Sequence, residues 1–166
     1  MKKATTLQDL YIAELKDLYS AENQILKALP KMIKAASTPE LQQGFEEHLE
    51  QTRGHVQRLE EIFEKLDQNP KGKKCKGLEG IVEEAKETMD EIEDPAVLDA
   101  ALIAGAQKVE HYEMASYGCV RTWARQLGDE EAANLLQQTL DEEAETDKKL
   151  TQLAESMVNL EAAHQQ

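Results

Sequence analysis

The sequence has few aromatic residues and few cysteines, and each shortage excludes a class of protein. Phe, Trp and Tyr make up only 4% of the 166 residues, a poor supply for the core of a β-sandwich or β-barrel. Cys75 and Cys119 form no CxxC pair, so we expect free thiols in a reducing compartment. No apolar run approaches the roughly 20 residues that span a bilayer. Because the N-terminus also lacks a signal-peptide core, we expect a cytoplasmic protein without a membrane partner.

Positive charge is scarce as well. The chain has 33 Asp and Glu residues against 19 Lys and Arg residues, and its formal net charge is −14. An acidic surface repels nucleic acid unless its basic residues cluster. Lys71, Lys73, Lys74 and Lys76 do cluster, but such a lysine run is usually a solvated connector. We therefore expect no nucleic-acid partner, whereas metal ions are compatible with this charge.

The residues that the chain has in abundance are helix formers, chiefly Ala, Leu, Glu, Lys and Gln. Apolar residues recur at helical spacing in four long segments. The predicted long helices run over residues 6–36, 37–69, 95–127 and 129–160, with a short helix at about 78–92 and a frayed tail at about 161–166. Pro30 lies inside the first segment and predicts a kink or a break there.

The order of these segments predicts an all-α fold in one domain spanning residues 1–166. Short loops force antiparallel neighbours, and a long central connection joining two hairpins is typical of ferritin-like four-helix bundles. The second and last helices form a weak repeat, because setting Leu49 against Leu140 places Leu59 on Leu150 without a gap. Two matching hairpins suggest an approximate two-fold symmetry, which suits a site for two metal ions.

Polar residues interrupt the apolar stripe of every long helix. Each residue turns a helix by about 100°, so each side chain can be assigned to a face. The inward polar residues are Glu22, His48, Thr52, His55, Glu113, Glu143, Thr146 and Asp147. Glu110 lies at the border of the apolar face, whereas Glu47 and Glu50 fall on the outer face. One such Glu usually reaches the rim or meets a lysine, and a core histidine usually bonds a carbonyl. Their coincidence near the middle of all four helices favours a shared site.

Carboxylates gathered in a core are costly, because burial and like charges disfavour ionisation. A metal cation removes that cost, and carboxylates with imidazoles suit iron or manganese. Bundles hold two such ions with one Glu from each of two helices and a Glu-x-x-His turn from each of the others. Here those turns appear as Thr52-x-x-His55 and Glu143-x-x-Thr146, so each keeps one ligand type, and Asp147 is a substitute carboxylate. The candidate ligands are Glu22, His48, His55, Glu110, Glu113, Glu143 and Asp147.

Several segments also resemble a known family. They are Leu18-Tyr19-Ser20-Ala21-Glu22, His48-Leu49-Glu50-Gln51-Thr52, residues 106–113 and Thr146-Asp147-Lys148-Lys149-Leu150-Thr151. Together they are similar to the YciF/YciE-like bacterial stress proteins, which are ferritin-like, over about Thr6 to Met157. The resemblance implies a four-helix bundle with an added short helix, a cytosolic homodimer and a role in stress. It places a dinuclear metal centre on Glu22, on Glu110 or Glu113, and on Glu143 with Asp147.

Two functions from different classes remain open. The first is a non-haem di-iron or di-manganese protein of the stress response with O₂ or peroxide chemistry, with no residue assigned a catalytic role. Tyr112, Tyr117 and Trp123 are then redox neighbours, although ordinary packing explains them more simply. The second is a non-catalytic interaction protein, whose inward polar groups form a hydrogen-bonded network that sets helix register. Iron storage in a cage is a weaker third hypothesis, because no cage contacts are recognisable.

Overall fold

A computed structural model describes residues 3–164, and the all-helical expectation is confirmed over that range. The helices are α1 (Leu7–Ala35), α2 (Pro39–Lys65), α3 (Lys76–Glu91), α4 (Pro95–Gln126), α5 (Glu130–Leu153), the π-helical turn η1 (Ala154–Val158) and α6 (Asn159–Ala163). None of the described helices is long and apolar enough to cross a membrane.

The helix ends follow from short-range chemistry. Thr6 and Asp9 form a capping box in which Thr6 Oγ1 accepts from the Asp9 amide at 3.0 Å and the Asp9 carboxylate accepts from the Thr6 amide at 3.1 Å. Asp94 caps α4 and Asp129 caps α5. Gly128 precedes the latter cap at φ 83°, a conformation that glycine adopts without steric cost. These caps satisfy amides that each new helix would otherwise leave free.

Two local predictions need correction. Of the kink or break predicted at Pro30, the break is absent, and α1 continues to Ala35. Pro30 is exposed, while Leu29 and Met32 beside it are buried, so packing of the inner face holds the helix together. The predicted fraying at about 161 is also absent, because η1 and α6 extend the chain to Ala163. Val158 of η1 is buried in the core, and this contact anchors the extension; residues 165–166 lie outside the described range.

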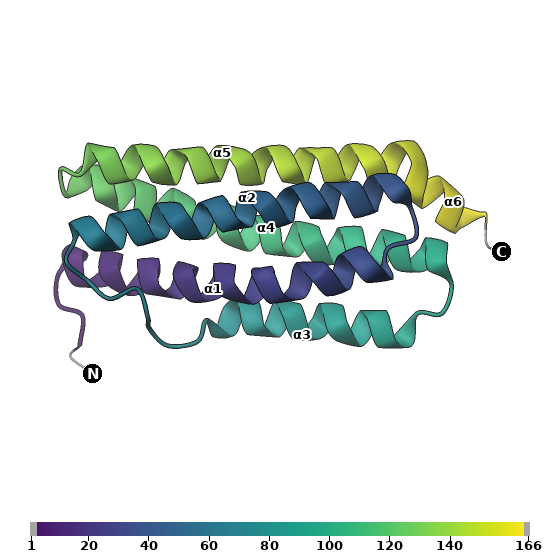
Figure 1. Ribbon diagram of the computed structural model, residues 1–166, viewed down its shortest axis with the longest axis horizontal. Coiled ribbons are helices and arrows are strands. Elements are labelled where there is room, and N and C mark those ends of the chain that lie inside the picture. The colour runs from purple at the N-terminus through teal and green to yellow at the C-terminus, as the bar shows by residue number, and fades with distance from the viewer. Residues whose placement is uncertain (1–2, 165–166) are drawn as a thin grey trace.

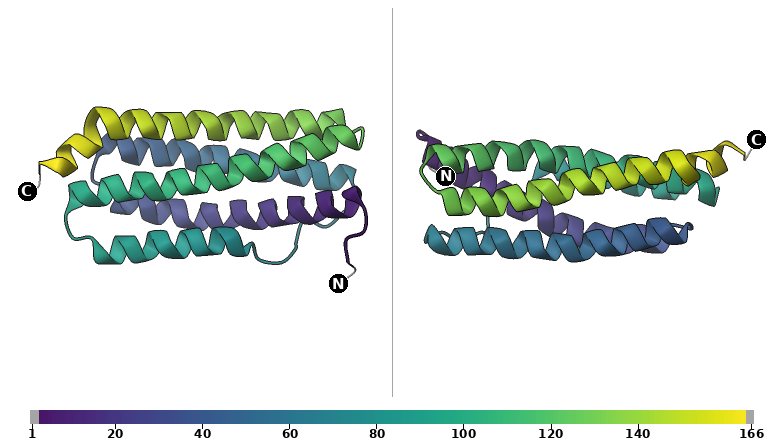
Figure 2. Two further views of the ribbon diagram at one scale, coloured as in Figure 1. Left: turned by 180° about the vertical axis from the view of Figure 1, so that it is seen from behind. Right: turned by 90° about the horizontal axis from the view of Figure 1, so that it is seen from above.

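The long helices lie side by side (Figure 1). α1 packs on α2 and α4, and α5 packs on α4 and α2. Each of the pairs α1–α2 and α4–α5 is an antiparallel hairpin. In the chain α3 connects the two hairpins, and it runs along the outside of the four long helices (Figures 1 and 2). α3 itself packs against α1 and α4. This connection makes α2 and α4 run in the same direction.

One buried carboxylate fastens the α1–α2 turn to α4. Asp99 of α4 is fully buried and accepts hydrogen bonds from the amide and hydroxyl groups of both Ser37 and Thr38, at 2.6–2.8 Å. Four donors compensate for the loss of hydration of this carboxylate. Asp99 therefore ties the turn of the α1–α2 hairpin to the first helix of the α4–α5 hairpin.

The apolar core consists of two clusters rather than one. The first is built around Leu29, Phe45, Leu78 and Leu102. The second is built around Leu15, Leu59, Phe63, Val120 and Leu136. On each long helix the two clusters are separated by the positions that carry buried polar residues. The middle of the molecule is therefore a buried polar layer between two apolar clusters.

Candidate metal centre

The buried polar layer receives side chains from all four long helices. Each side chain continues the inward stripe of its helix; Glu22, for example, lies between the buried residues Leu18 and Ile25 on α1. The acid and imidazole members are at most 4% exposed. They are Glu22 of α1, His48 and His55 of α2, Glu110 and Glu113 of α4, and Glu143 of α5.

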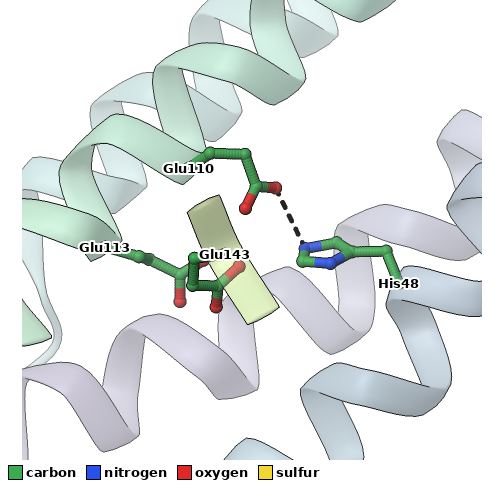
Figure 3. A group of neighbouring side chains, drawn as sticks. All are labelled: His48, Glu110, Glu113 and Glu143. Atoms are coloured by element: carbon green, nitrogen blue, oxygen red, sulfur yellow. Dashed lines mark ion pairs between the residues drawn. The ribbon is translucent and has the colours of Figure 1, made fainter. Parts of the chain in front are cut away.

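Two groups within this layer have the geometry of cation sites. In the first, His48, Glu110, Glu113 and Glu143 each offer one ligand atom, and these atoms lie within 4.8 Å of one another (Figure 3). The second group consists of Glu22, His55 and Glu143, whose ligand atoms also lie within 4.8 Å of one another. Glu143 belongs to both groups, so it is the one residue that the two groups share.

The hydrogen bonding of the layer is incomplete. Both carboxylate oxygens of Glu113 and of Glu143 lack a hydrogen-bond partner, as does one oxygen each of Glu22 and Glu110. Outside the layer, the only other such buried side-chain atoms found in residues 3–164 are Tyr11 Oη and Arg121 Nε. A buried acceptor without a donor costs about 1–3 kcal/mol, and a charged one costs more. The layer therefore has the donor set and the unsatisfied oxygens that a cation needs.

The two histidines present nitrogen atoms to the same groups. His48 Nε2 lies 3.1 Å from Glu110 Oε1, and His55 Nδ1 lies 3.0 Å from Glu143 Oε1 and 3.4 Å from Glu22 Oε1. Neither His48 Nε2 nor His55 Nδ1 is aligned for a hydrogen bond with these oxygens. Both atoms are thus near the carboxylates without being satisfied by them.

Burial and mutual contact shift the pKa values of these groups in opposite directions. Burial, and then the charge of Glu143, raises the pKa of Glu110 and of Glu113 well above 4.5. Burial alone would lower the pKa of His55, but contacts with Glu142, Glu143 and Glu22 outweigh it and raise this pKa to about 11. The contact with His55 outweighs burial at Glu143 and lowers its pKa. Without a cation, charge is concentrated on the His55–Glu143 pair.

A second set of contacts surrounds His55 on the outer side of α2 and α5. His55 Nε2 lies 2.8 Å from Glu142 Oε2, and Arg58 donates to both oxygens of Glu142, at 2.7 and 2.8 Å. Arg58 also donates to Thr139 Oγ1 at 3.1 Å. Because the carboxylate accepts from Nε2–H, a ring that gave up its second proton to a bound cation would present its lone pair on Nδ1. This network therefore aims Nδ1 at Glu22 and Glu143.

Tyr117 holds Glu22 from the other side, since its hydroxyl donates to Glu22 Oε1. Its ring also lies edge-on to His55, with centroids 6.4 Å apart. Tyr112 instead donates to Asp17 at 3.0 Å and contacts Cys75. Trp123 packs against the second apolar cluster. Tyr117 therefore contacts two candidate ligands, whereas Tyr112 and Trp123 contact other parts of the fold.

The structure brings six of the seven candidate ligands together. Asp147 lies apart: it is half-buried, accepts from Gln107 Nε2 at 3.2 Å and lies 3.3 Å from His111 Nε2. Thr52 donates to the His48 carbonyl, and Thr146 donates to Gln51. Glu47 and Glu50 are exposed, in agreement with their predicted outward direction.

Sequence reasoning missed the network of Arg58, Thr139 and Glu142. Its only sequence signal is position, because Arg58 lies one helical turn beyond His55 and Glu142 adjoins Glu143. The internal repeat also offered a further sequence argument that Glu113 is equivalent to Glu22. The register that sets Leu49 on Leu140 is an offset of 91 residues, and the same offset sets Glu22 on Glu113. The repeat therefore extends to the first helix of each hairpin.

Two cavities reach the layer, and both end at His48 and Glu110. One, of about 120 Å³, lies between α1, α3 and α4. The other, of about 220 Å³, lies between α2, α4 and α5 and is lined by polar residues such as Gln43, Gln51 and Thr146. The layer is therefore open on the His48 side.

These features define an all-helical protein with a buried layer of carboxylates and imidazoles. The chain belongs to the family described as "Domain of unknown function (DUF892)", whose model matches residues 6–163. It is similar to Protein YciF of Escherichia coli K12, with 50% identity over 159 residues and 95% of each chain covered.

Solved structures give the same relationship. The crystal structure of the E. coli stress protein YciF matches with a TM-score of 0.90 and 48% identity, over 94% of this chain and 99% of that one. YcfI from Rhodopseudomonas palustris, described as a candidate structural protein, matches with a TM-score of 0.88 and 45% identity, over 90% and 96% of the two chains. The resemblance to YciF-like proteins is thus confirmed.

Proposed function

We propose that this protein binds two iron or manganese ions in the buried polar layer and acts in a bacterial stress response. The observation that carries the proposal is the set of unpartnered carboxylate oxygens in two groups that share Glu143. In this assignment Glu22 and His55 hold one ion, and His48, Glu110 and Glu113 hold the other. Glu143, which belongs to both groups, would be a ligand to both ions.

The donor set fits those metals. Four carboxylates and two imidazoles, without a thiolate, suit iron or manganese better than a structural zinc site. When bound, two such ions would supply the one-electron steps that reduction of O₂ or a peroxide requires. The chain itself positions the ligands: Glu142 orients His55, and the Tyr117 hydroxyl holds one oxygen of Glu22. The two apolar clusters flank the layer along the helix axes and exclude bulk water from those two sides.

Further support comes from chain connectivity and from relatives. Two antiparallel hairpins joined by a connection that runs back along the bundle support a ferritin-like four-helix arrangement. The similarity to the E. coli stress protein YciF supports the role in stress. A cytoplasmic homodimer is part of the same proposal, and sedimentation of the purified protein tests the dimer.

The direct test is anaerobic titration of metal-stripped protein with Fe(II) or Mn(II). We expect two ions per chain, and a near-ultraviolet absorbance change when air reaches the Fe(II) form. Glu143→Gln should weaken both sites by at least about 100-fold, because it removes the shared ligand. Glu145→Gln on the same helix is the matched control, since Glu145 is exposed. If neither Fe(II) nor Mn(II) bound, the proposal would be contradicted.

The alternative is a protein whose buried polar groups serve only to set helix register. The satisfied contacts favour it: Arg58 and His55 both donate to Glu142, and Tyr117 donates to Glu22. The similarity to YcfI is consistent with such a structural role. In that case Glu143→Gln should reduce the free energy of unfolding equally with and without added metal.

A further inference from the structure

The cavity between α1, α3 and α4 has apolar walls and a polar inner end. Its walls include Ile25, Leu29 and Met32 of α1 and Val82, Ala85 and Met89 of α3. Its inner end is formed by the buried residues His48 and Glu110, which belong to the polar layer. The apolar walls and the volume of about 120 Å³ make this cavity distinct from the polar opening beside α5.

The size and lining of the cavity indicate an organic occupant. A dry apolar cavity of about 150 Å³ is known to hold benzene, whereas water needs two to four polar partners. Between the inner end and the polar residues Gln24, Lys27, Lys31 and Lys86, the remaining lining side chains are apolar and offer water no partner. A body of about five or six carbon atoms fits the space by the same measure.

The rim of the cavity carries positive charge. Lys27 and Lys31 of α1 and Lys86 of α3 line it, and all three are exposed. None of them forms an ion pair with a residue that the structure describes. In a chain of net charge −14, this rim is a local site of attraction for an anion.

The charges also set the direction of the occupant. Glu110 stands at the inner end, with Glu113 and Glu143 close behind it. A carboxylate at this buried end would lose its hydration with no lysine or arginine to pair with, whereas the three lysines favour one at the rim. An occupant with one apolar end and one anionic end therefore enters with its apolar end first.

We propose that this cavity binds a short to medium-chain fatty acid, with its carboxylate at Lys27, Lys31 and Lys86 and its alkyl chain pointing to His48 and Glu110. Binding itself requires no metal. Its meaning rests on the function proposed above, because the end of the alkyl chain would lie beside the candidate metal centre.

The methionines provide a test in the metal-free full-length protein. Met32 and Met89 line the cavity, whereas Met114 and Met157 line neither cavity. With ¹³C-methyl-methionine labelling, added hexanoate should give saturable shifts at Met32 and Met89 and none at Met114 and Met157. From butanoate to hexanoate the affinity should rise about fourfold per methylene, and it should level off for longer chains.

Two variants test separately the contact of the carboxylate with the lysines and the occupation of the cavity by the alkyl chain. Replacing Lys27, Lys31 and Lys86 together by alanine should weaken hexanoate about tenfold and leave hexanol binding unchanged. Gly105→Leu should abolish binding, because Gly105 lines the cavity and a Cβ there already contacts the Cβ of Ala85 at 3.6 Å, so the rest of the leucine side chain must occupy the cavity. Gly118→Leu on the same helix is the control, since a Cβ there has no neighbour within 4 Å.

Several results would overturn this proposal. They are the absence of saturable shifts, equal shifts at all four methionines, and hexanoate binding that the lysine substitutions leave unchanged. Dilution-dependent shifts of Met32 and Met89 without ligand would instead identify a second copy of the chain as the occupant. Because these measurements use metal-free protein, they are independent of the outcome of the metal titration.

Discussion

The two histidines of the buried polar layer are held in different ways. His55 is fully buried, and its Nε2 contacts Glu142, which Arg58 holds through two hydrogen bonds. His48 has no hydrogen bond on either ring nitrogen within residues 3–164, and both cavities end at it. We conclude that the His55 side is preorganised and closed, whereas the His48 side is accessible. A ligand or oxidant would therefore exchange on the His48 side.

The largest difference should appear when each histidine is removed. In metal-free protein, His55→Ala should cost about 3–5 kcal/mol of unfolding free energy, because it leaves the buried charge of Glu143 without its partner. His48→Ala should cost about half as much, since His48 satisfies no hydrogen bond. Urea denaturation measures both values. Equal losses would remove the distinction between the two sides.

The second prediction concerns metal affinity on the closed side. Arg58→Met frees Glu142 and so loosens His55, and we expect metal affinity to fall about 10–100-fold. Arg53→Met is the matched control on α2, because Arg53 is exposed and pairs with the exposed Glu50. Competition against a chromogenic chelator measures the affinity. An unchanged affinity in Arg58→Met would show that the outer network does not orient a ligand.

The third prediction uses pH to separate the two sides. The pKa values of Glu110 and Glu113 are raised above 4.5, so their stabilising contribution is present below pH 4.5 and is lost as pH rises. The pKa of His55 is raised from 6.5 to about 11, so its contribution is lost between those values. The free energy of unfolding of metal-free protein should therefore fall with pH, by up to about 1.4 kcal/mol per unit for each group.

The pH windows assign these losses to residues. From pH 5 to 6.5 the slope reports Glu110 and Glu113, and replacing both by Gln should flatten it. Above pH 6.5 His55 adds to the slope, and His55→Ala should remove that addition. Metal binding displaces protons from the carboxyl groups, so metal affinity should increase with pH. A metal-free protein whose stability rises over pH 5–8 would contradict these assignments.

The smallest effect is expected at Tyr117. Tyr117→Phe leaves Glu22 Oε1 without its donor, and we expect a loss of about 1–2 kcal/mol in metal-free protein. Tyr19→Phe is the control, because its hydroxyl donates to Glu60 in an exposed hydrogen bond. Bound metal should reduce the cost at Tyr117, since Glu22 would then be satisfied by the cation. Thermal unfolding with and without metal measures this difference.

The periodicity of the sequence accounts for the helices and for the inward direction of the candidate ligands. A helix turns by about 100° per residue, so the phase of an apolar stripe reports the face of every residue on it. Glu22 and Glu143 are buried for that reason, and Glu50 is exposed. Asp147 shows the limit of this argument: its angle points inward, but its partners Gln107 and His111 of α4 lie nearer the surface.

Contacts between distant segments could be decided only by tertiary structure. The outer network joins Arg58 of α2 to Glu142 of α5, and the apolar cavity exists because α3 docks on α1 and α4. Local sequence determined the helices and their faces, because both depend on residues within one or two turns. Packing decided which inward acids share Glu143, since that depends on the relative shift and rotation of four separate helices.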